Sequence, residues 1–282
     1  MNDQSKHQTF SFELFPPKTE KGFENLKTNV EKLQTLNPAF FSVTYGAGGS
    51  TQQRTFDTVD WLVEKRIDTA PHLSCIGADN SEIIELLERY RDQGIRRLVA
   101  LRGDLPSGTG LGGLGELNHA NQLVELIRKT FGDYFHIEVA AYPEFHPQAV
   151  TPEQDLNYFK GKVEAGANSA ITQYFYNADA YFRFLDECQR LQIDIPIVPG
   201  IMPITNFTQL ARFSDACGTE IPRWLRKRLE GYGDDLDSIR SYGADVVTAM
   251  CERLLAEGAP GLHFYTMNQS AHCLKIWQAL QL

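Results

Sequence analysis

The stretch TFSFELFPPK, residues 9–18, sets the pattern that decides the fold of this chain. Its side chains alternate as in a β-strand, with apolar residues at every second position from Phe10 to Leu14 and with Ser11 and Glu13 between them, until two prolines end it. A buried carboxylate without a partner costs several kcal/mol, about the effective penalty for an ion taken out of water. We therefore expect Glu13 to be paired, to be solvated at a cleft, or to be retained for chemistry.

Strand-like segments of this kind recur along the chain and alternate with helical patterns. From Phe23 to Leu33, for example, apolar residues recur at spacings of three and four, as on one face of a helix. Another helix is expected to start after Thr151, with Pro152 in its first turn and the capping-box pattern T-P-E-Q, and to end at Gly166. The expected strands are residues 10–15, 40–45, 69–75, 97–101, 137–142, 169–175, 195–199 and 262–266.

These eight strand–helix units predict the α/β class and a (β/α)8 TIM barrel, an architecture that about 250 residues form as one unit. The chain has 282 residues, and no linker rich in proline or serine divides it. We expect residues 9–282 to form a single catalytic domain and residues 1–8 to form an N-terminal tail. Residues 205–260, between the seventh and eighth strands, are numerous enough for extra helices.

The composition narrows the classes of ligand and partner that this protein can bind. With 36 acidic and 27 basic residues and a net charge of −9, the chain offers no extended basic face for a nucleic acid, so an anionic ligand needs local positive charge. The N-terminus lacks the apolar core of a signal peptide, and no run approaches the about 18 apolar residues of a membrane span, so we expect a cytoplasmic protein. The five cysteines are scattered and never form a C-x-x-C pair, which favours reduced, buried thiols over disulfides or structural zinc.

Polar residues follow a second pattern, because strand after strand ends in groups that can do chemistry. The active site of a TIM barrel lies at the carboxyl ends of its strands. The residues found there are Glu13, Thr44, His72, Arg102, Gly103, Asp104, Tyr142, Glu144, Gln173, Tyr265, Thr266 and Asn268.

Glu13 is the candidate general acid of such a site. Phe15, two residues further on, offers an apolar wall, and apolar surroundings penalise the ionised form of a carboxyl group near neutral pH. The alternative is a structural carboxylate paired with Arg or Lys at the barrel mouth, since such networks are also common. The residues alone leave both interpretations open.

Other candidate residues have ordinary explanations as well. The triplet at residues 102–104 is typical of a turn with a local ion pair, but its place directly after a strand favours a ligand site. His72 alone is typical of a core histidine with satisfied hydrogen bonds, and His146 of an exposed loop residue. Asp155 and Lys162 lie seven apart on one helix face, which is typical of a solvated charged face.

The glycine-rich stretch at residues 108–113 matches the dinucleotide pattern G-x-G-x-x-G. Six residues separate it from the preceding strand, whereas the fingerprint needs its first glycine at the tight turn after the strand, so we reject a Rossmann site. A loop this rich in glycine is typical of a mobile lid over a site. The chain also lacks G-x-S-x-G, H-E-x-x-H and G-K-[ST] motifs, and nothing in it indicates a metal.

Eight motifs, in order from Phe10 onwards, carry a resemblance to a known family. They are FELFPPK, FFSVTYGAGGSTQQRT, APHLSC, LVALRGDLP, VAAYPEFHP, AGANSAITQYFY, PGIMPITNF and HFYTMN. With them the chain resembles bacterial 5,10-methylenetetrahydrofolate reductase, a flavin-containing (β/α)8 barrel that reduces 5,10-methylenetetrahydrofolate to 5-methyltetrahydrofolate for methionine synthesis. The resemblance implies FAD as cofactor, NADH or NADPH as reductant, a ping-pong mechanism with one shared site, and a homo-oligomer.

The resemblance also implies roles for individual residues. Glu13 matches the general acid that protonates N10 of the folate, so that the ring opens to a 5-iminium cation, and Asp104 matches a residue beside the flavin whose charge stabilises that cation. Positions that match FAD contacts are Thr44, Tyr45, Ala47, His72, Arg102, Gly103, Asp104, Ala120, Tyr142, His146, Ala149, Asp155 and Lys162. Positions that match folate contacts are Thr44, Gln173, Gln209, Phe213 and Gln269.

The chain departs from the family pattern at a few positions. Gln269 stands where many members carry an Arg that helps to hold the folate, and Tyr158 and Gly161 stand where polar or basic residues contact FAD. Longer eukaryotic members add a regulatory domain, which we expect this chain to lack. No acidic residue at a recognisable ribose position decides between NADH and NADPH.

Two other functions fit parts of the same pattern. A flavin-free barrel that binds a pterin and transfers a methyl group predicts a protein without a bound chromophore. A storage module for folate or flavin predicts binding without NADH oxidation.

Overall fold

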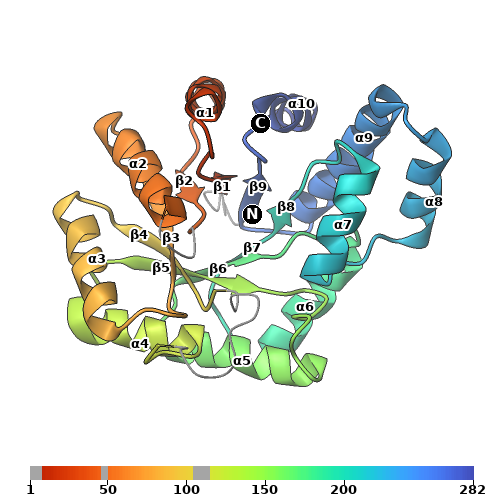
Figure 1. The fold of residues 1–282 in the computed structure, drawn as a ribbon. Coiled ribbons are helices and arrows are strands. Elements are labelled where there is room, and N and C mark those ends of the chain that lie inside the picture. The colour runs from red at the N-terminus through yellow and green to blue at the C-terminus, as the bar shows by residue number, and fades with distance from the viewer. Residues whose placement is uncertain (1–7, 46–49, 104–114) are drawn as a thin grey trace, which may run out of the picture.

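The computed structural model describes residues 8–45, 50–103 and 115–282, with strands at the centre and helices around them (Figure 1). The strands are β1 Thr9–Leu14, β2 Phe40–Val43, β3 Thr69–Ser74, β4 Arg97–Leu101, β5 His136–Ala141, β6 Ser169–Thr172, β7 Ile197–Val198, β8 Gly200–Ile201 and β9 Gly261–Tyr265. The helices are α1 Glu20–Gln34, α2 Ser50–Glu64, α3 Asn80–Asp92, α4 Ala120–Phe131, α5 Pro152–Glu164, α6 Ala178–Arg190, α7 Phe207–Cys217, α8 Arg223–Tyr232, α9 Leu236–Ala256 and α10 Ser270–Leu280.

The sheet is parallel and closes on itself through its seventh strand. Its order is β7-β6-β5-β4-β3-β2-β1-β9-β8, and only Pro199 separates β7, at one end of that order, from β8 at the other. Proline has no N–H for a sheet ladder, so it interrupts the strand, but its carbonyl still accepts the N–H of His263 at 3.0 Å. The predicted (β/α)8 barrel is confirmed, whereas the predicted seventh strand, residues 195–199, is wrong in extent.

The alternation of β1 separates two environments. Phe12 and Leu14 are fully buried in the main core, where the Phe12 ring lies 6.0 Å from that of Trp277 on α10. Ser11 and Glu13 face the barrel lumen, where both meet side chains of other strands. Burial of a large apolar side chain contributes about 1.5–3 kcal/mol, so the outward residues hold β1 against its helices and fix the inward direction of Glu13.

A buried polar network lies in the lumen at the amino ends of β4, β5 and β6. Glu138 is paired with Arg97 and lies 3.3 Å from His136, and it accepts a 2.6 Å hydrogen bond from Ser169. Burial alone would raise the pKa of Glu138, but the hydrogen bond from His136, the charge of Arg97 and the Ser169 hydroxyl together lower it. The lumen at this end of the barrel therefore holds a carboxylate that is paired and hydrogen-bonded.

The expected extra helices between the seventh and last strands are present. The segment from β8 to β9 holds α7, α8 and α9, where a regular barrel unit needs one helix. Figure 1 shows α8 on the outside of the barrel, next to α9. The helix predicted after Thr151 is also confirmed, since the Thr151 hydroxyl accepts the N–H of Gln154 at 3.2 Å and Gly166 follows its end with a φ of 113°.

The cysteines form no disulfides, and most of them are buried. None of the five is joined to another by a disulfide bond, and four of them have almost no access to solvent. Burial raises the pKa of Cys75 to about 11 and that of Cys273 to about 12, so both remain uncharged thiols at neutral pH.

None of the helices in the described ranges is long and apolar enough to cross a membrane.

Candidate active site at the mouth of the barrel

The carboxyl ends of all strands meet at one mouth, because the sheet is parallel and closed. Ala47, Asp104 and the glycine-rich stretch 108–113 lie outside the described residues. The other predicted site residues belong to a strand, to the loop behind one, or to the nearby ends and faces of helices. They are Glu13, Thr44, Tyr45, His72, Arg102, Gly103, Ala120, Tyr142, His146, Ala149, Asp155, Lys162, Gln173, Gln209, Phe213 and Gln269.

Glu13 lies at the bottom of the mouth, with histidines as its partners. Its Oε2 atom is 3.5 Å from Nε2 of His72 and 3.7 Å from Nε2 of His263, and a fifth of its side chain is exposed. Within the described ranges, no Arg or Lys forms an ion pair with Glu13, so the alternative of a carboxylate held by a permanent cation is not supported there. The carboxyl group has access to the mouth on one side and contacts imidazoles on the other.

His72 is not the satisfied core histidine that its strand position suggests. It is 6% exposed, yet its Nε2 atom has no hydrogen-bond partner. Burial lowers the pKa of His72, the nearby Glu13 carboxylate opposes this effect, and His263 adds to it. His72 is therefore a neutral imidazole at physiological pH.

The residues of β9 and the loop after it surround Glu13. Sequence reasoning placed Tyr265, Thr266 and Asn268 at this end of the barrel but missed His263. Thr266 donates its hydroxyl to the carbonyl of Glu13 at 2.6 Å, and Asn268 bonds both the N–H and the carbonyl of Phe15. Tyr265 donates to the carbonyl of Thr172 at 2.7 Å. The period of two along HFYT places His263 and Tyr265 on the face that Glu13 occupies, and this is the signal that could have revealed His263.

A second group of predicted residues joins the loop after β5 to α5. The N–H of His146 donates to Asp155 at 2.9 Å, Tyr142 packs edge-on against His146 at 4.7 Å, and Lys162 donates to the carbonyl of Ala140 at 2.6 Å. The alternative of a solvated charged face is therefore wrong, because Asp155 and Lys162 both contact the backbone around β5.

The charges of this second group are altered by their surroundings. Burial raises the pKa of Asp155, although the His146 N–H and the charge of Lys162 partly offset the effect. Burial lowers the pKa of Lys162 to about 8, and the charge of Asp155 opposes that shift. The ammonium group of Lys162 is thus incompletely compensated, which favours a bound anion beside it.

The turn after β4 brings Arg102 towards the same loop. Its guanidinium group donates to the side chain of Gln148, and its carbonyl accepts the Ser74 hydroxyl at 2.8 Å. Gly103 follows with a φ of 90°, and a Cβ atom there would lie 1.9 Å from the Ser74 oxygen. This close approach requires glycine next to the predicted anion-binding Arg102.

We expect Gly103→Ala to lower the free energy of unfolding by about 1–3 kcal/mol, because it adds both a steric conflict with Ser74 and a strained backbone. Gly231→Ala is the matched control, since this residue of α8 has open space for a Cβ atom and a helical backbone. That control is expected to gain about 0.5–1 kcal/mol. Urea denaturation measures both, and equal stability of Gly103→Ala and wild type would contradict the packing argument.

Thr44 and Tyr45 directly follow β2 at the mouth of the barrel. The N–H of Thr44 donates to the carbonyl of Leu14 at 2.9 Å, which places Thr44 beside the end of β1. The hydroxyl of Tyr45 accepts a 2.6 Å hydrogen bond from Gln52, and burial raises its pKa. Ala120 is the first residue of α4 and is half-buried.

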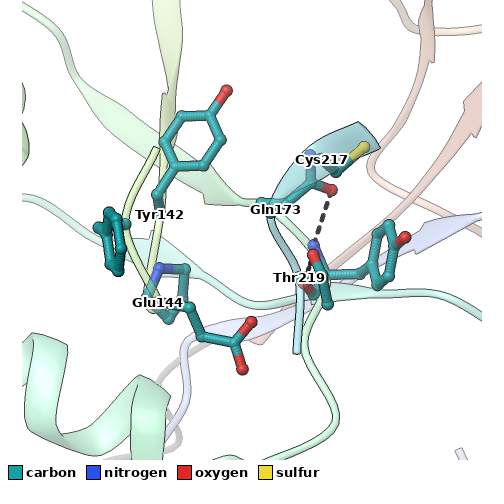
Figure 2. A pocket seen from close by; sticks show the side chains of 9 residues that line it. Tyr142, Glu144, Gln173, Cys217 and Thr219 are labelled. Atoms are coloured by element: carbon teal, nitrogen blue, oxygen red, sulfur yellow. Dashed lines mark hydrogen bonds between the residues drawn. The ribbon is translucent and has the colours of Figure 1, made fainter. Parts of the chain in front are cut away.

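Gln173 lines a small pocket between the loops after β5 and β6 and the end of α7. Figure 2 shows Tyr142 and Glu144 on one side of it and Gln173, Cys217 and Thr219 on the other. The pocket is narrow, and it lies between Tyr142 of the second group and the end of α7, the first of the extra helices.

Helix α7 carries Gln209 and Phe213 one turn apart, next to its buried residue Ser214. Ser214 shares a 3.2 Å hydrogen bond with the hydroxyl of Tyr174, which ties α7 to the strand end that bears Gln173. Gln209 and Gln269 are exposed, and neither side chain contacts Glu13 or Lys162. The structure thus gathers predicted residues into two groups, one around Glu13 and one around Lys162. The folate positions on α7 and just before α10 lie apart from both groups.

Comparison with known proteins decides the family. The chain matches a family profile described as "Methylenetetrahydrofolate reductase" over residues 1–281. It is also 40% identical to 5,10-methylenetetrahydrofolate reductase of Escherichia coli (strain K12) over 261 residues, which cover 92% of this chain and 86% of that protein. The chain belongs to the methylenetetrahydrofolate reductase family.

The reductase has relatives in plants as well. It is 40% identical over 285 residues to "Methylenetetrahydrofolate reductase (NADH) 1" of Arabidopsis thaliana, covering 97% of this chain and 48% of the plant protein. The family consists of oxidoreductases of one-carbon folate metabolism, so this chain is an enzyme of that class.

Solved structures confirm the barrel of the reductase. An uncharacterized protein from Clostridium thermocellum, described as binding two copies of 5-methyl-5,6,7,8-tetrahydrofolic acid, aligns with a TM-score of 0.68 over 97% of this chain and 94% of that one. A thermostable aldo-keto reductase, Tm1743, aligns with a TM-score of 0.54 over 97% of this chain and 89% of that one. Their identities are 18% and 11%, so these likenesses show the fold alone.

The residues of the reductase fit a flavin dinucleotide. A pyrophosphate needs positive charge, and this acidic chain supplies the guanidinium of Arg102 and the partly uncompensated ammonium of Lys162 near the loop after β5. Tyr142 and His146 add aromatic surface beside them. The donor set therefore suits an anionic ligand with aromatic rings.

Proposed function

We propose that this reductase uses FAD and NADH to convert 5,10-methylenetetrahydrofolate to 5-methyltetrahydrofolate, by a ping-pong mechanism that supplies methyl groups for methionine synthesis. The observation that carries the proposal is the position of Glu13. Its carboxyl group lies at the floor of the mouth with two histidines, and no Arg or Lys, within 4 Å in the described ranges, so it can hold a proton and present it to a substrate above. A carboxylate locked by Arg or Lys would not serve as an acid in this way.

The roles of the folate positions follow from their place around this carboxyl group. Glu13 would protonate N10 of the folate, while Thr44, beside the end of β1, and Gln173, at the end of β6, would orient the pterin. Gln209 and Phe213 on α7 would approach from one side, with the Phe213 ring stacked on the substrate. Gln269 at the start of α10 would hold the glutamate tail by hydrogen bonds instead of charge.

The cofactor positions follow from the second group. When bound, the flavin supplies the hydride transfer between the nicotinamide and the folate. Arg102 and Lys162 would hold its phosphates, Tyr142 and His146 would contact its rings, and Asp104 would lie beside it. NADH is the proposed reductant, a choice supported by the name of the Arabidopsis thaliana relative, "Methylenetetrahydrofolate reductase (NADH) 1".

We expect Lys162→Met to weaken the binding of FAD by about 10–100-fold, because a charge-assisted hydrogen bond contributes about 1.5–3 kcal/mol. Lys160→Met is the matched control, since Lys160 lies on the same helix but pairs with Glu164 at 3.6 Å on its exposed side. Wild-type affinity should also fall as the pH rises through about 8, because deprotonation of free Lys162 removes the charge that attracts the phosphates.

Titration of the flavin-free protein with FAD, followed by flavin fluorescence at several pH values, measures both effects. Unchanged affinity in Lys162→Met would remove Lys162 from the cofactor site.

The visible spectrum of the purified protein, recorded without oxygen, tests the proposed function. A flavin spectrum that bleaches with NADH and returns with methylenetetrahydrofolate would establish both half-reactions. A colourless protein that cannot take up FAD would contradict the proposal and favour the flavin-free pterin barrel, and flavin that NADH does not reduce would favour a storage module. The cytoplasmic location and the homo-oligomer stay predictions.

A further inference from the structure

The lumen below Glu13 holds a pair of histidines that the proposed reaction uses only in part. Nε2 of His72, on β3, and Nε2 of His263, on β9, face the same carboxyl oxygen at 3.5 and 3.7 Å. Both nitrogens are buried, and neither has a hydrogen-bond partner. His72 matches a cofactor position, whereas His263 has had no role so far.

A carboxyl group that acts as an acid must be accommodated in two protonation states. The carboxylate accepts hydrogen bonds, whereas the carboxylic acid also donates one. Lys and Arg can only donate, so they would favour the ionised form. A neutral imidazole supplies either a donor or an acceptor, and two imidazoles together can supply both.

Ser11 indicates which of these His263 supplies. Its oxygen lies 2.7 Å from Nδ1 of His263, is buried, and has no other hydrogen-bond partner among the described residues. A buried hydroxyl hydrogen without an acceptor costs free energy, so the serine O–H donates to Nδ1. Nε2 of His263 then carries the ring hydrogen and points a donor at Glu13.

His72 supplies the complementary group. Burial lowers the pKa of His72, Glu13 opposes this effect, and His263 adds to it. The ring is therefore neutral, and one of its two nitrogens bears no hydrogen. With the donor already provided by His263, a bare Nε2 on His72 gives Glu13 an acceptor. The separations of 3.5 and 3.7 Å are typical of a free enzyme whose catalytic hydrogen bonds tighten when substrate binds.

We propose that His263 and His72 form a donor–acceptor pair that holds the Glu13 carboxyl group in both protonation states, with His263, oriented by Ser11, as a positioning residue of the reaction. This inference rests on the proposed function. The ionised carboxylate accepts the Nε2–H of His263, and the acid form donates to Nε2 of His72 until a substrate nitrogen at the mouth replaces that contact. The proton that leaves comes from Glu13, and both histidines keep theirs.

The other polar groups near Glu13 are uncharged, and none of them pairs with its carboxyl group in the described ranges. Tyr265 of β9 is held by its bond to Thr172, and burial, together with the charge of Glu13, raises its pKa well above the usual value, so it stays neutral. Ser42, the β2 residue in register with Glu13, has a buried hydroxyl without a hydrogen-bond partner, so it does not bond to Glu13. Within the described ranges, the two histidines are thus the ionisable groups paired with Glu13 from β3 and β9.

The pH dependence of the folate half-reaction tests the pair. His263→Phe keeps an aromatic ring against Phe40, whose centroid is 6.1 Å away, but removes the donor to the ionised carboxylate. We expect the alkaline limb of folate reduction by pre-reduced enzyme to move upward by about one pH unit, a tenfold change in proton affinity. Ser11→Ala should move it in the same direction by less, and His263→Gln, which keeps an N–H, should restore it in part.

A titration that does not depend on turnover provides the second readout. Flavin-free protein labelled with ¹³C at the glutamate carboxyl groups is titrated by NMR, and Glu13→Gln identifies the relevant signal. Its midpoint should shift upward in His263→Phe as the kinetic limb does, while reduction of flavin by NADH changes less than about twofold, because that step needs no acid.

Folded His263→Phe and Ser11→Ala proteins with the wild-type limb and the wild-type carboxyl midpoint would overturn the inference. If the wild type itself shows no folate-dependent step, the proposed function fails, and the NMR titration still decides whether the histidine pair acts on Glu13.

Discussion

Glu13→Gln is expected to slow the reduction of methylenetetrahydrofolate by about 10²–10⁴-fold, the usual contribution of a positioned general acid. Gln keeps the size and the hydrogen-bonding oxygen of the side chain but has no acidic proton to give to the folate. Reduction of the bound flavin by NADH needs no such proton and should stay within about twofold of wild type. Rapid-mixing absorbance of the flavin measures the two half-reactions separately.

Glu144→Gln is the matched control at the same mouth. Glu144 is a half-buried carboxylate that accepts the N–H of Glu220 at 2.8 Å, and an amide oxygen can accept that bond equally well. We expect less than about a threefold change in either half-reaction, because the variant loses no donated proton. Equal losses of both half-reactions in Glu13→Gln would contradict the role of Glu13 as the acid.

Glu138→Ala is expected to lower the free energy of unfolding by about 3–5 kcal/mol, the cost of breaking a buried pair by removal of one partner. The change leaves Arg97 without its carboxylate inside the barrel and removes the acceptor of the Ser169 hydroxyl. Urea denaturation of the wild type and the variant measures the difference. An apolar double variant, Glu138→Leu with Arg97→Met, should recover much of the loss, because it removes both charges together.

The control for this variant is Glu187→Ala on α6. Glu187 pairs with Arg190 one turn away, but both side chains are at least half exposed, and exposed pairs contribute about 0.2–1 kcal/mol. If Glu138→Ala loses no more stability than Glu187→Ala, the buried network at the amino ends of the strands does not stabilise the barrel.

The same carboxylate predicts an acid limit for the fold. The pKa of Glu138 is lower in the folded protein than in the unfolded chain, where it is about 4.3. Its stabilising contribution is therefore complete above the unfolded value and is lost as the pH falls through the folded value. The unfolding free energy of Glu138→Gln should fall less steeply below about pH 4 than that of the wild type.

Much of the site could be predicted because it depends on local patterns. The alternation of residues 9–14 indicated that Ser11 and Glu13 face away from the helices, and the seven-residue spacing of Asp155 and Lys162 indicated one shared face. The same patterns did not reveal that this face contacts the carbonyl of Ala140, since a helix period does not specify what lies opposite.

Two glutamates in apolar strands show what the local sequence patterns could not predict. Glu13 and Glu138 both interrupt a strand of buried residues, and the sequence does not distinguish their environments. The structure pairs Glu138 with Arg97 at the amino ends of the strands and places Glu13 against His72 and His263 below the mouth.

The sequence by itself determined the order of strands and helices and the direction of the β1 side chains, because both depend on periods of two to four residues. It also contains the short motifs that mark the reductase family. Only the tertiary structure decided that His263 reaches Glu13. The two residues are 250 positions apart and meet because the barrel closes β9 onto β1, in a register that depends on every strand between them.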